Sequence, residues 1–277
     1  DQALDVSLST QYPDIQIHNI CFDSRKCQDG DLFVALQGDR DGHDFIPDAI
    51  ANGAKAILLR QDFVQAFPKS LLKGVVMIPC LDPLASLQKM AVWKRKQFKC
   101  PWIAITGSNG KTTTKEWITH LLSKRWHVGK NLGNFNNHIG LPISILNLSQ
   151  DTQVVVLEMG MNHAGEIAQL CETARPNVGL VTNIGQAHIG NFENIETLAM
   201  AKEELYCWIE RYQEEFSFIF NLNDFFVKKM YQARRQDHIK SYAIGEKADL
   251  MIQNVRWGKQ SIYADLYENY QIVSQIS

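Results

Sequence analysis

Apolar and polar positions alternate with two different periods along the last two thirds of the chain. Short apolar runs predict buried strands, and apolar residues three or four apart predict amphipathic helices. The strands are expected at 102–106, 154–157, 178–182 and 216–220, and the helices at 113–126, 165–174 and 195–212. Strands that alternate with helices indicate a doubly wound, mostly parallel sheet. Beyond about residue 239, extended segments at 250–257 and 262–267 predict a hairpin.

A smaller α/β pattern occupies the first hundred residues. Its expected strands are 15–22, 31–36, 54–59 and 74–78, with a helix at 45–52 and an amphipathic stretch at 84–98. The pattern restarts at 99–101, where Pro101 disfavours helix in the residue before it. We therefore expect an α/β protein of two domains, a small one over 1–98 and a larger one over 99–277. In the first helix of the larger domain we expect an inward face formed by Trp117, Ile118, Leu121 and Leu122.

Composition limits the classes of function. Hydrophobic residues make up 45% of the 277 residues and charged residues 21%, which supports a folded core. The formal net charge is −2 without a basic stripe, so we expect no nucleic-acid partner. The longest apolar runs are about eight residues, far below the roughly 20 that cross a bilayer, so we expect no membrane span. The sequence has no GxSxG or HExxH motif, which removes two common hydrolase classes.

The six cysteines, at positions 21, 27, 80, 100, 171 and 207, form no CxxC pair. Their density is also too low for a disulfide scaffold, and cytoplasmic proteins keep their thiols reduced. We therefore interpret Cys21 and Cys27 as ordinary thiols and expect a cytoplasmic location.

A polar cluster follows each of the four strands of the larger domain. The clusters are 107–113, Glu158, 183–188 and 221–224. In an open parallel sheet the ligand crevice lies at the carboxyl ends of the strands. The sequence therefore predicts a single site at this edge.

The first cluster has the composition of a phosphate-binding loop. Gly107, Ser108, Asn109, Gly110, Lys111, Thr112 and Thr113 follow a strand and open a helix. Glycines allow close approach of the backbone, the lysine can reach phosphates, and a threonine can bind Mg²⁺. The loop is two residues shorter than GxxxxGK[ST]. The alternative is a polar turn with a surface lysine.

Three further residues have two interpretations each. Glu158 directly follows an apolar strand, where a carboxylate either binds Mg²⁺ or caps the next helix. Lys202 falls within the apolar stripe of helix 195–212, so it either extends its ammonium to solvent or is buried with a lowered pKa. His188 lies at the predicted edge and is either structural or part of the site.

Together, several ordered segments resemble one known family, the Mur ligases of peptidoglycan synthesis. The segments are Asp23-Ser24-Arg25, 30–36 with Asp41-Gly42-His43, the short loop 106–113, 133–140, 158–163 with 165–167, and Ala187-His188 followed by Ala201-Lys202. Segment 133–140 and the Asn162-His163 pair resemble the member that adds D-alanyl-D-alanine more than the one that adds diaminopimelate or lysine.

The resemblance implies a role for each matching position. Ser24, Arg25, Asp41, Gly42 and His43 would contact the UDP end of UDP-N-acetylmuramoyl-tripeptide. Lys111 and the rest of the loop would bind the phosphates of ATP, and Thr112, Glu158 and His188 would organise Mg²⁺. Lys202 would be carbamylated by CO₂ and become a further magnesium ligand. Asn136 would face the substrate, Asn137 the nucleotide, and Asn221 the adenine, although Asn223 replaces the aspartate usual in the family.

The implied reaction transfers the γ-phosphoryl group of ATP to the terminal carboxylate of the tripeptide. The amine of D-alanyl-D-alanine then attacks the acyl phosphate. The catalytic residues would be Lys111, Lys202 and His188. The resemblance also implies a monomer, and a third, carboxyl-terminal domain that this sequence lacks. We therefore expect these 277 residues to bind ligands but to turn over poorly alone.

Two alternatives stay open. Another amide ligase of the same superfamily, similar to folylpolyglutamate synthetase, would share the loop, Glu158 and Lys202 but lack a uridine-binding first domain. A non-catalytic nucleotide-binding module is the second alternative, and it predicts that replacing Lys202 with alanine in a complete chain costs no activity.

Overall fold

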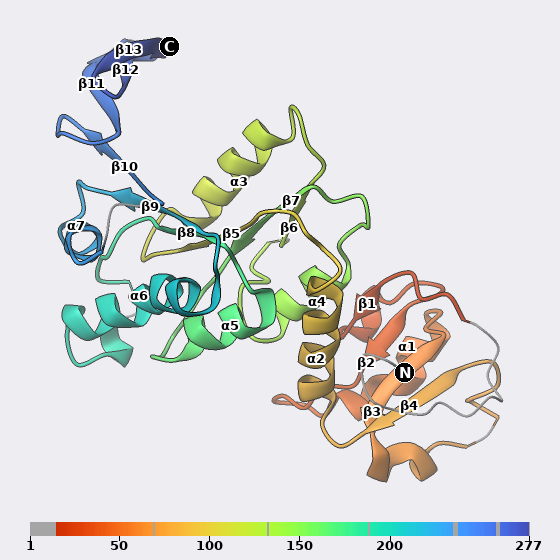
Figure 1. Cartoon of the computed structure of the whole chain (residues 1–277). Helices are drawn as coiled ribbons and strands as arrows, with labels where there is room; N and C mark the ends of the chain where they lie inside the picture. Colours follow the sequence, from red (N-terminus) through yellow and green to blue (C-terminus); the bar gives the residue numbers. More distant parts are fainter. Residues whose placement is uncertain are drawn as a thin grey trace. The chain divides into compact units, whose positions relative to one another are not determined.

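The computed structural model describes residues 15–68, 70–131, 133–187, 189–234, 238–258 and 261–276. The chain divides into two compact units (Figure 1). The first unit comprises Asp1–Lys99 with His138–Gln150, and the second comprises Cys100–Asn137 with Asp151–Ser277. The segment His138–Gln150 thus groups with the first unit, whereas the sequence pattern places it in the second.

The first unit is a parallel sheet with the strand order β1-β2-β3-β4. Its strands are β1 (Ile20–Cys21), β2 (Leu32–Val34), β3 (Ala56–Arg60) and β4 (Val76–Cys80). Its helices are α1 (Ile46–Ala51), α2 (Pro83–Arg95) and α4 (Gly140–Leu146), with 3₁₀ turns η1 (Ser24–Lys26), η2 (Gly42–Phe45) and η3 (Gln61–Ala66). All four predicted strands are present, but β1 is far shorter than expected because only Ile20 and Cys21 pair with β2.

The second unit is a nine-stranded sheet with the order β13-β12-β11-β10-β9-β8-β5-β7-β6. Its strands are β5 (Trp102–Thr106), β6 (Val128–Lys130), β7 (Val154–Glu158), β8 (Val178–Val181), β9 (Ser217–Asn221), β10 (Ile239–Ile244), β11 (Leu250–Trp257), β12 (Ile262–Glu268) and β13 (Gln271–Ile276). Neighbouring strands from β6 to β11 are parallel, and β11, β12 and β13 are antiparallel. The predicted parallel sheet and terminal hairpin are confirmed.

Helices cover both faces of this sheet. They are α3 (Lys111–Leu122), α5 (Glu166–Ala174), α6 (Ile195–Tyr212) and α7 (Phe225–Gln232), with the 3₁₀ turn η4 (Ile189–Asn191). Figure 1 shows α3 on one face and α5 and α6 on the other. Strands β6, β10 and β13 and helices α4 and α7 are absent from the sequence-based expectations, because each is short and its apolar pattern is brief.

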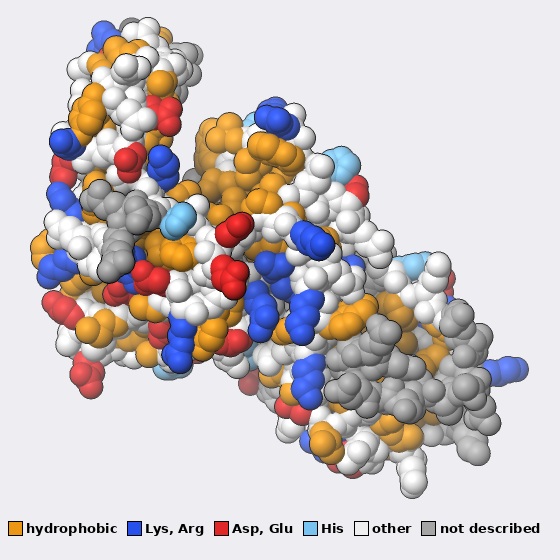
Figure 2. All heavy atoms as spheres, in the orientation of Figure 1, with side chains coloured by type: hydrophobic (Ala, Val, Ile, Leu, Met, Phe, Trp, Pro, Cys, Tyr) orange, Lys and Arg blue, Asp and Glu red, His pale blue; other side chains and the backbone are white. Residues whose placement is uncertain are grey.

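The predicted inward face of α3 is partly wrong. Ile118 and Leu122 do pack against the sheet, but Trp117 and Leu121 are each 63% exposed. The buried positions are instead Lys115 and Thr119. Figure 2 shows the resulting gathering of hydrophobic side chains on the surface over α3. A lysine thus takes an inward position that periodicity assigned to apolar side chains, because polar partners inside the unit hold it there.

Cys21 and Cys27 form a disulfide, so their interpretation as ordinary thiols is wrong for this structure. Their Cα atoms lie 6.1 Å apart, because η1 turns the chain back toward the end of β1. Spacing alone did not reveal this approach. Among the described residues, no helix combines the length and apolar character that a membrane span requires.

Candidate functional site

Residues 107–110 connect β5 to α3 through a tight turn at the carboxyl edge of the sheet. Gly107 has φ of +141°, and a Cβ atom there would lie 2.0 Å from Thr182 Oγ1. Only glycine avoids both the backbone strain and this clash. The first glycine of the loop is therefore required by the close approach of β8.

Hydrogen bonds anchor this loop to the segment after β8. The Ser108 amide donates to Asn183 O over 2.9 Å, and the Asn109 amide donates to Asn183 Oδ1 over 3.0 Å. The Thr182 hydroxyl donates to Asn109 O over 2.7 Å. The loop is thus held in shape by protein groups alone, which lowers the entropic cost of binding an anion in it.

The amino end of α3 is suited to an anion. Gly110 is its N-cap residue, and among the described residues no side chain caps the helix. The first amides of a helix lack intrahelical acceptors and carry the positive end of its dipole. Lys111 adds a side chain whose Nζ donates to Gly107 O over 2.9 Å and to Ser108 O over 3.2 Å. Burial lowers the pKa of Lys111, and the nearby Glu158 charge opposes that shift.

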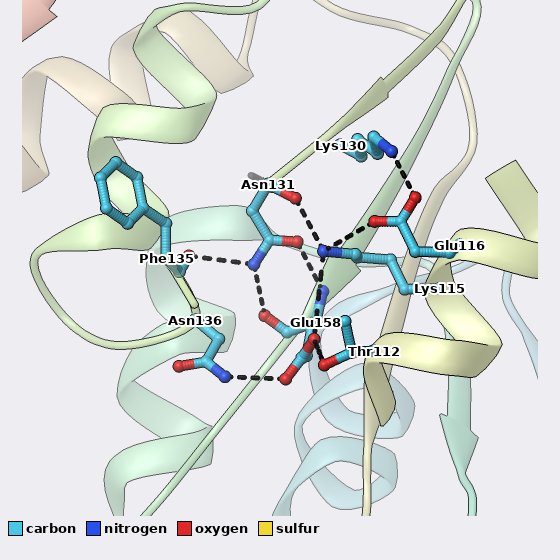
Figure 3. A network of polar contacts seen from close by, with 8 residues as sticks. All are labelled: Thr112, Lys115, Glu116, Lys130, Asn131, Phe135, Asn136 and Glu158. Atoms are coloured by element: carbon cyan, nitrogen blue, oxygen red, sulfur yellow. Dashed lines mark hydrogen bonds and ion pairs between the residues drawn. The ribbon is translucent and has the colours of Figure 1, made fainter. Parts of the chain in front are cut away.

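Glu158 ends β7 with its carboxylate held at both oxygens. Only 3% of the residue is exposed. The Thr112 hydroxyl donates to Glu158 Oε2 over 2.7 Å, and Asn136 Nδ2 donates to Oε1 over 2.8 Å (Figure 3). The capping alternative for Glu158 does not apply, because Gly165 is the N-cap residue of α5 and no side-chain cap is present there. The first turn of α3 therefore meets the end of β7 through this carboxylate.

A second layer of polar contacts lies behind Glu158. Asn131 exchanges two 2.9 Å hydrogen bonds with the Glu158 backbone, and its own carbonyl accepts from Lys115 Nζ over 2.9 Å. Lys115 is fully buried, 4.0 Å from Glu158 Oε2 and 3.3 Å from Glu116 Oε1. Glu116 also pairs with Lys130 (Figure 3). A buried ammonium thus lies beside the buried carboxylate.

Sequence reasoning missed Lys115 and Asn131. Lys115 has one usable signal, because it lies four residues after Lys111 and side chains at that spacing share a helix face. Asn131 has none, since it follows the unpredicted strand β6.

Lys202 lies in α6 with only 1% of its surface exposed. The predicted stripe around it is present, since Leu198, Leu205 and Ile209 are buried as well. The interpretation in which Lys202 extends its ammonium to solvent is therefore wrong. Burial, with the positive charge of Lys111, lowers the pKa of Lys202 to about 8. Its amine is therefore partly neutral near physiological pH. The charge of Lys111 thus acts on Lys202, and the charge of Glu158 acts on Lys111.

The remaining predicted residues are Thr113, Asn137, Asn221 and His188. Thr113 and Asn137 are exposed, at the first turn of α3 and at the end of segment 133–137. Asn221 ends β9, where its Nδ2 donates to Thr182 O over 2.9 Å and its Oδ1 accepts from the Asn223 amide over 3.1 Å. His188 lies outside the described residues.

The donor set suits Mg²⁺. Among the described residues, Glu158 belongs to no cluster of three acidic, histidine or cysteine ligands. Magnesium usually takes one or two carboxylates and completes its octahedron with water and phosphate oxygens. This coordination is available here, because Glu158 offers a carboxylate, Thr112 offers a hydroxyl, and an anion at the amino end of α3 would offer further oxygens.

The first unit contains a separate pocket of 480 Å³. Ser24, Arg25 and Gly42 line it as predicted positions, together with Phe22, Asp23, Leu36, Gln37, Gly38, Arg40, Phe45, Asp48 and Ile139. A Cβ on Gly42 would lie 2.5 Å from Leu36 O, so the pocket wall requires glycine there.

Arg40 and Phe45 provide a positive charge and an aromatic ring in the lining of this pocket. The Arg40 guanidinium lies 4.9 Å from the centre of the Phe45 ring, and Phe22 adds a second ring. Arg25 pairs with Asp23 over 2.8 Å, which lowers the pKa of that carboxyl. Guanidinium groups beside aromatic rings suit a ligand that is both anionic and planar. Sequence reasoning missed Phe22, Arg40 and Phe45, because no motif marks them.

His43 supports the fold instead of facing this pocket. It is buried, stacks on Phe63 and accepts a 3.0 Å hydrogen bond at Nε2 from the Arg60 amide. Its Nδ1 pairs with Asp41. Neither Asp41 nor His43 is among the described residues that line the pocket.

Two family models match the chain. Residues 105–276 match the Mur ligase middle domain, and residues 16–93 match the model described as Mur ligase family, catalytic domain. A relative from Rickettsia prowazekii, UDP-N-acetylmuramoyl-tripeptide–D-alanyl-D-alanine ligase, is 40% identical over 205 residues. That match covers 74% of this chain and 43% of the relative.

Solved structures give the same similarity. MurF from Acinetobacter baumannii superposes with a TM-score of 0.81 at 31% identity, covering 96% of this chain and 56% of that one. MurF ligase from Thermotoga maritima in complex with ADP gives 0.79 at 30% identity, covering 94% and 58%. The chain therefore spans about half the length of the relatives it matches.

Proposed function

The chain belongs to the Mur ligase family, as its motifs predict, and from this premise we propose that it forms the UDP-substrate and ATP-binding parts of a cytoplasmic peptidoglycan ligase. The proposed reaction joins D-alanyl-D-alanine to UDP-N-acetylmuramoyl-tripeptide and converts ATP to ADP and phosphate. The Rickettsia relative has that activity as its name, and the Thermotoga structure was solved with ADP. We propose 1–98 as the UDP-substrate domain, 99–277 as the ATP-binding domain, and a monomeric state.

One observation carries the catalytic part of the proposal. Lys111 and Thr112 open α3, and the Thr112 hydroxyl donates a 2.7 Å hydrogen bond to Glu158 at the end of β7. Lys202, buried in α6, has a pKa that burial and then the charge of Lys111 lower. The stability of the fold does not require the uncapped amino end of α3, the carboxylate of Glu158 and the buried amine of Lys202. A complex of Mg²⁺ with a triphosphate would use all three groups, because the helix end would bind phosphate and the other two would bind the metal.

Each residue then has a role in phosphoryl transfer. The loop amides and Lys111 would hold the phosphates of ATP, and Thr112 and Glu158 would hold Mg²⁺, with His188 as a further ligand. Bound Mg²⁺ would neutralise charge on the transferring phosphoryl group. Asn136 would act on the substrate side, and Asn137 and Asn221 on the nucleotide side. Protein catalysis here consists mainly of placing two anionic groups together.

For Lys202 we propose carbamylation. The neutral amine attacks CO₂, a C–N bond forms, and one proton is released, which leaves a carbamate with a single negative charge. This change would turn a buried cation into an oxygen ligand for Mg²⁺. A carbamate resonance in the ¹³C spectrum of the chain with labelled bicarbonate, absent from Lys202→Met, is the expected result.

Lys115 and Asn131 would position Glu158. Asn131 fixes the backbone of Glu158 through two hydrogen bonds, and Lys115 places a positive charge 4.0 Å from its buried carboxylate. Without a cation nearby, a buried carboxylate is strongly disfavoured.

Titrations of the 277-residue chain test the proposal. We expect saturable binding of UDP, and separately of ATP, with the ATP affinity raised by Mg²⁺ and lost in Lys111→Ala. A ligase similar to folylpolyglutamate synthetase would bind Mg²⁺–ATP but not UDP. A non-catalytic nucleotide-binding module would bind ATP with no contribution from Glu158 or Lys202. Either result overturns the proposal.

A further inference from the structure

Cys21, Cys27 and Asp31 form a cluster of potential metal ligands in the first unit. Their two sulfur atoms and a carboxylate oxygen all lie within 4.8 Å of one another. Cys21 ends β1, Cys27 follows η1, and Asp31 immediately precedes β2. The parallel pairing of β1 with β2 and the intervening turn hold the three together. None of them takes part in the proposed reaction.

The carboxylate of Asp31 provides a second, independent observation. Only 3% of the residue is exposed. Its Oδ2 accepts a 2.9 Å hydrogen bond from the Gln28 amide, whereas Oδ1 is buried and, within the described part of the chain, has no hydrogen-bond partner. Nor does Asp31 enter any ion pair found among the described residues. An unpaired buried carboxylate oxygen is costly and calls for a missing partner, such as a cation.

We propose that, in the reduced protein, Cys21, Cys27 and Asp31 bind a divalent cation of the Zn²⁺ class. Two thiolates and one carboxylate are typical Zn²⁺ ligands, and water would complete a tetrahedron. The cation would satisfy Asp31 Oδ1 and offset the charge of the two thiolates. Cys21 is only partly buried, so it leaves a path for metal entry.

The disulfide and the metal site exclude each other. In the structure the sulfurs are bonded to each other, and such sulfurs are not anionic ligands. A phosphine reductant takes up the oxygen of one water molecule, becomes the phosphine oxide and delivers two electrons and two protons, giving two thiols. The cation then replaces both thiol protons. A reducing cytoplasm favours the thiol form.

The site also bears on the neighbouring pocket. Phe22, Asp23, Ser24 and Arg25 lie between the two cysteines and line that pocket. Metal binding would fix this segment in the reduced protein as the disulfide fixes it in the oxidised one. This consequence rests on the proposed role of the pocket, but the metal site itself does not.

Cobalt titration of the whole chain tests the metal site directly. The chain is reduced with a phosphine, freed of reductant without air and titrated with Co²⁺, whose sulfur charge-transfer absorption reports thiolate ligands. We expect one equivalent to bind with this absorption and Zn²⁺ to displace it. The oxidised chain should not bind. No charge-transfer band from the fully reduced chain, or equal binding by the oxidised chain, overturns the proposal.

Variants assign the ligands. Cys21→Ser should abolish the charge-transfer band or reduce it to that of one thiolate. Loss of an outer-shell partner in metal sites costs about 10–100-fold in affinity, so Asp31→Asn, which removes a direct ligand, should weaken Co²⁺ binding about tenfold or more. Cys80→Ser with Cys100→Ser removes two cysteines outside the proposed site and serves as the matched control. Binding that follows these control cysteines instead would refute the assignment.

Discussion

The Thr112 hydroxyl donates a 2.7 Å hydrogen bond to Glu158 Oε2 and thereby connects the first turn of α3 to the end of β7. The same two groups are the proposed magnesium ligands. The protein thus holds them near each other before any ligand binds, so little reorganisation is needed when it does.

Thr112→Val should weaken Mg²⁺-dependent ATP binding. The substitution keeps the shape of the side chain but removes one oxygen ligand and the hydrogen bond to Glu158. Loss of one magnesium ligand should lower the affinity about tenfold, which corresponds to about 1.4 kcal/mol. Calorimetric titration with ATP, with and without Mg²⁺, measures the effect. Thr114→Val, one residue outside the predicted loop, should leave both affinities unchanged, and equal losses in the two variants would contradict the assignment.

Lys115→Met should destabilise the second unit and raise the Mg²⁺ concentration needed for nucleotide binding. Removing one partner of a buried ion pair costs about 3–5 kcal/mol, because the other charge is left uncompensated. Urea unfolding measures the stability. ATP binding without metal should change little, since the polar partners of Lys115 in the described part of the chain are Glu158, Glu116 and Asn131, which lie outside the phosphate loop.

Lys130→Met is the matched control for Lys115. Lys130 pairs with Glu116 but is partly exposed, and among the ion pairs of the described residues it has none with Glu158. The variant should retain the Mg²⁺ dependence of the unsubstituted chain. If both lysine variants shifted it equally, Glu116 and not Glu158 would be the group that matters.

The pKa of Lys202 predicts a pH dependence of stability. Its folded value of about 8 lies below its ordinary value of 10.5. Between these values the unfolded chain holds more protons on this group than the folded chain, so its contribution to the free energy of unfolding rises with pH. Urea unfolding in CO₂-free buffer at several pH values from 7.5 to about 10 measures this window. The difference between the unsubstituted chain and Lys202→Met should therefore grow in favour of the lysine as pH rises. A constant difference would mean that folding does not lower the pKa of Lys202.

Local pattern predicted those elements whose signal is contained in their own residues. Strand β5 and helix α6 have the expected bounds, because each presents a full run or stripe of apolar side chains. The phosphate loop and Glu158 were also recognisable from their positions after strands. The position of Lys202 in the stripe was visible, but only burial in the fold decides between its two interpretations.

Features that depend on distant partners were not predictable. The orientation of α3 depends on Lys115, whose acceptor Asn131 is 16 residues away and follows a strand of three residues. Likewise, Phe22 and Arg40 meet only at a pocket formed by several loops. The bond between Cys21 and Cys27 depends on the turn at η1 and not on their spacing.

Gly107→Ala should abolish ATP binding by distorting the phosphate loop. The added Cβ would lie 2.0 Å from Thr182 Oγ1, and φ of +141° is strained for alanine. Relief requires movement of the loop away from β8, which breaks its anchoring hydrogen bonds. Gly190→Ala is the control, because a Cβ there meets no atom of the described residues within 4 Å. ATP titration of both variants decides the point, and unchanged affinity in Gly107→Ala would show that the loop geometry does not govern binding.

Arg40→Ala should weaken UDP binding to the first unit without affecting ATP. Arg40 lines the pocket and lies over Phe45, so its loss removes a cation suited to a diphosphate and exposes a ring. We expect a loss of about tenfold, corresponding to about 1.4 kcal/mol, and a weaker dependence of UDP affinity on salt. Lys55→Ala removes an exposed cation of the same unit that pairs with Asp29 outside the pocket lining. Calorimetric titration with UDP at two salt concentrations compares the affinities of Arg40→Ala and Lys55→Ala. If Lys55→Ala weakened binding as much as Arg40→Ala, general charge and not this pocket would account for UDP affinity.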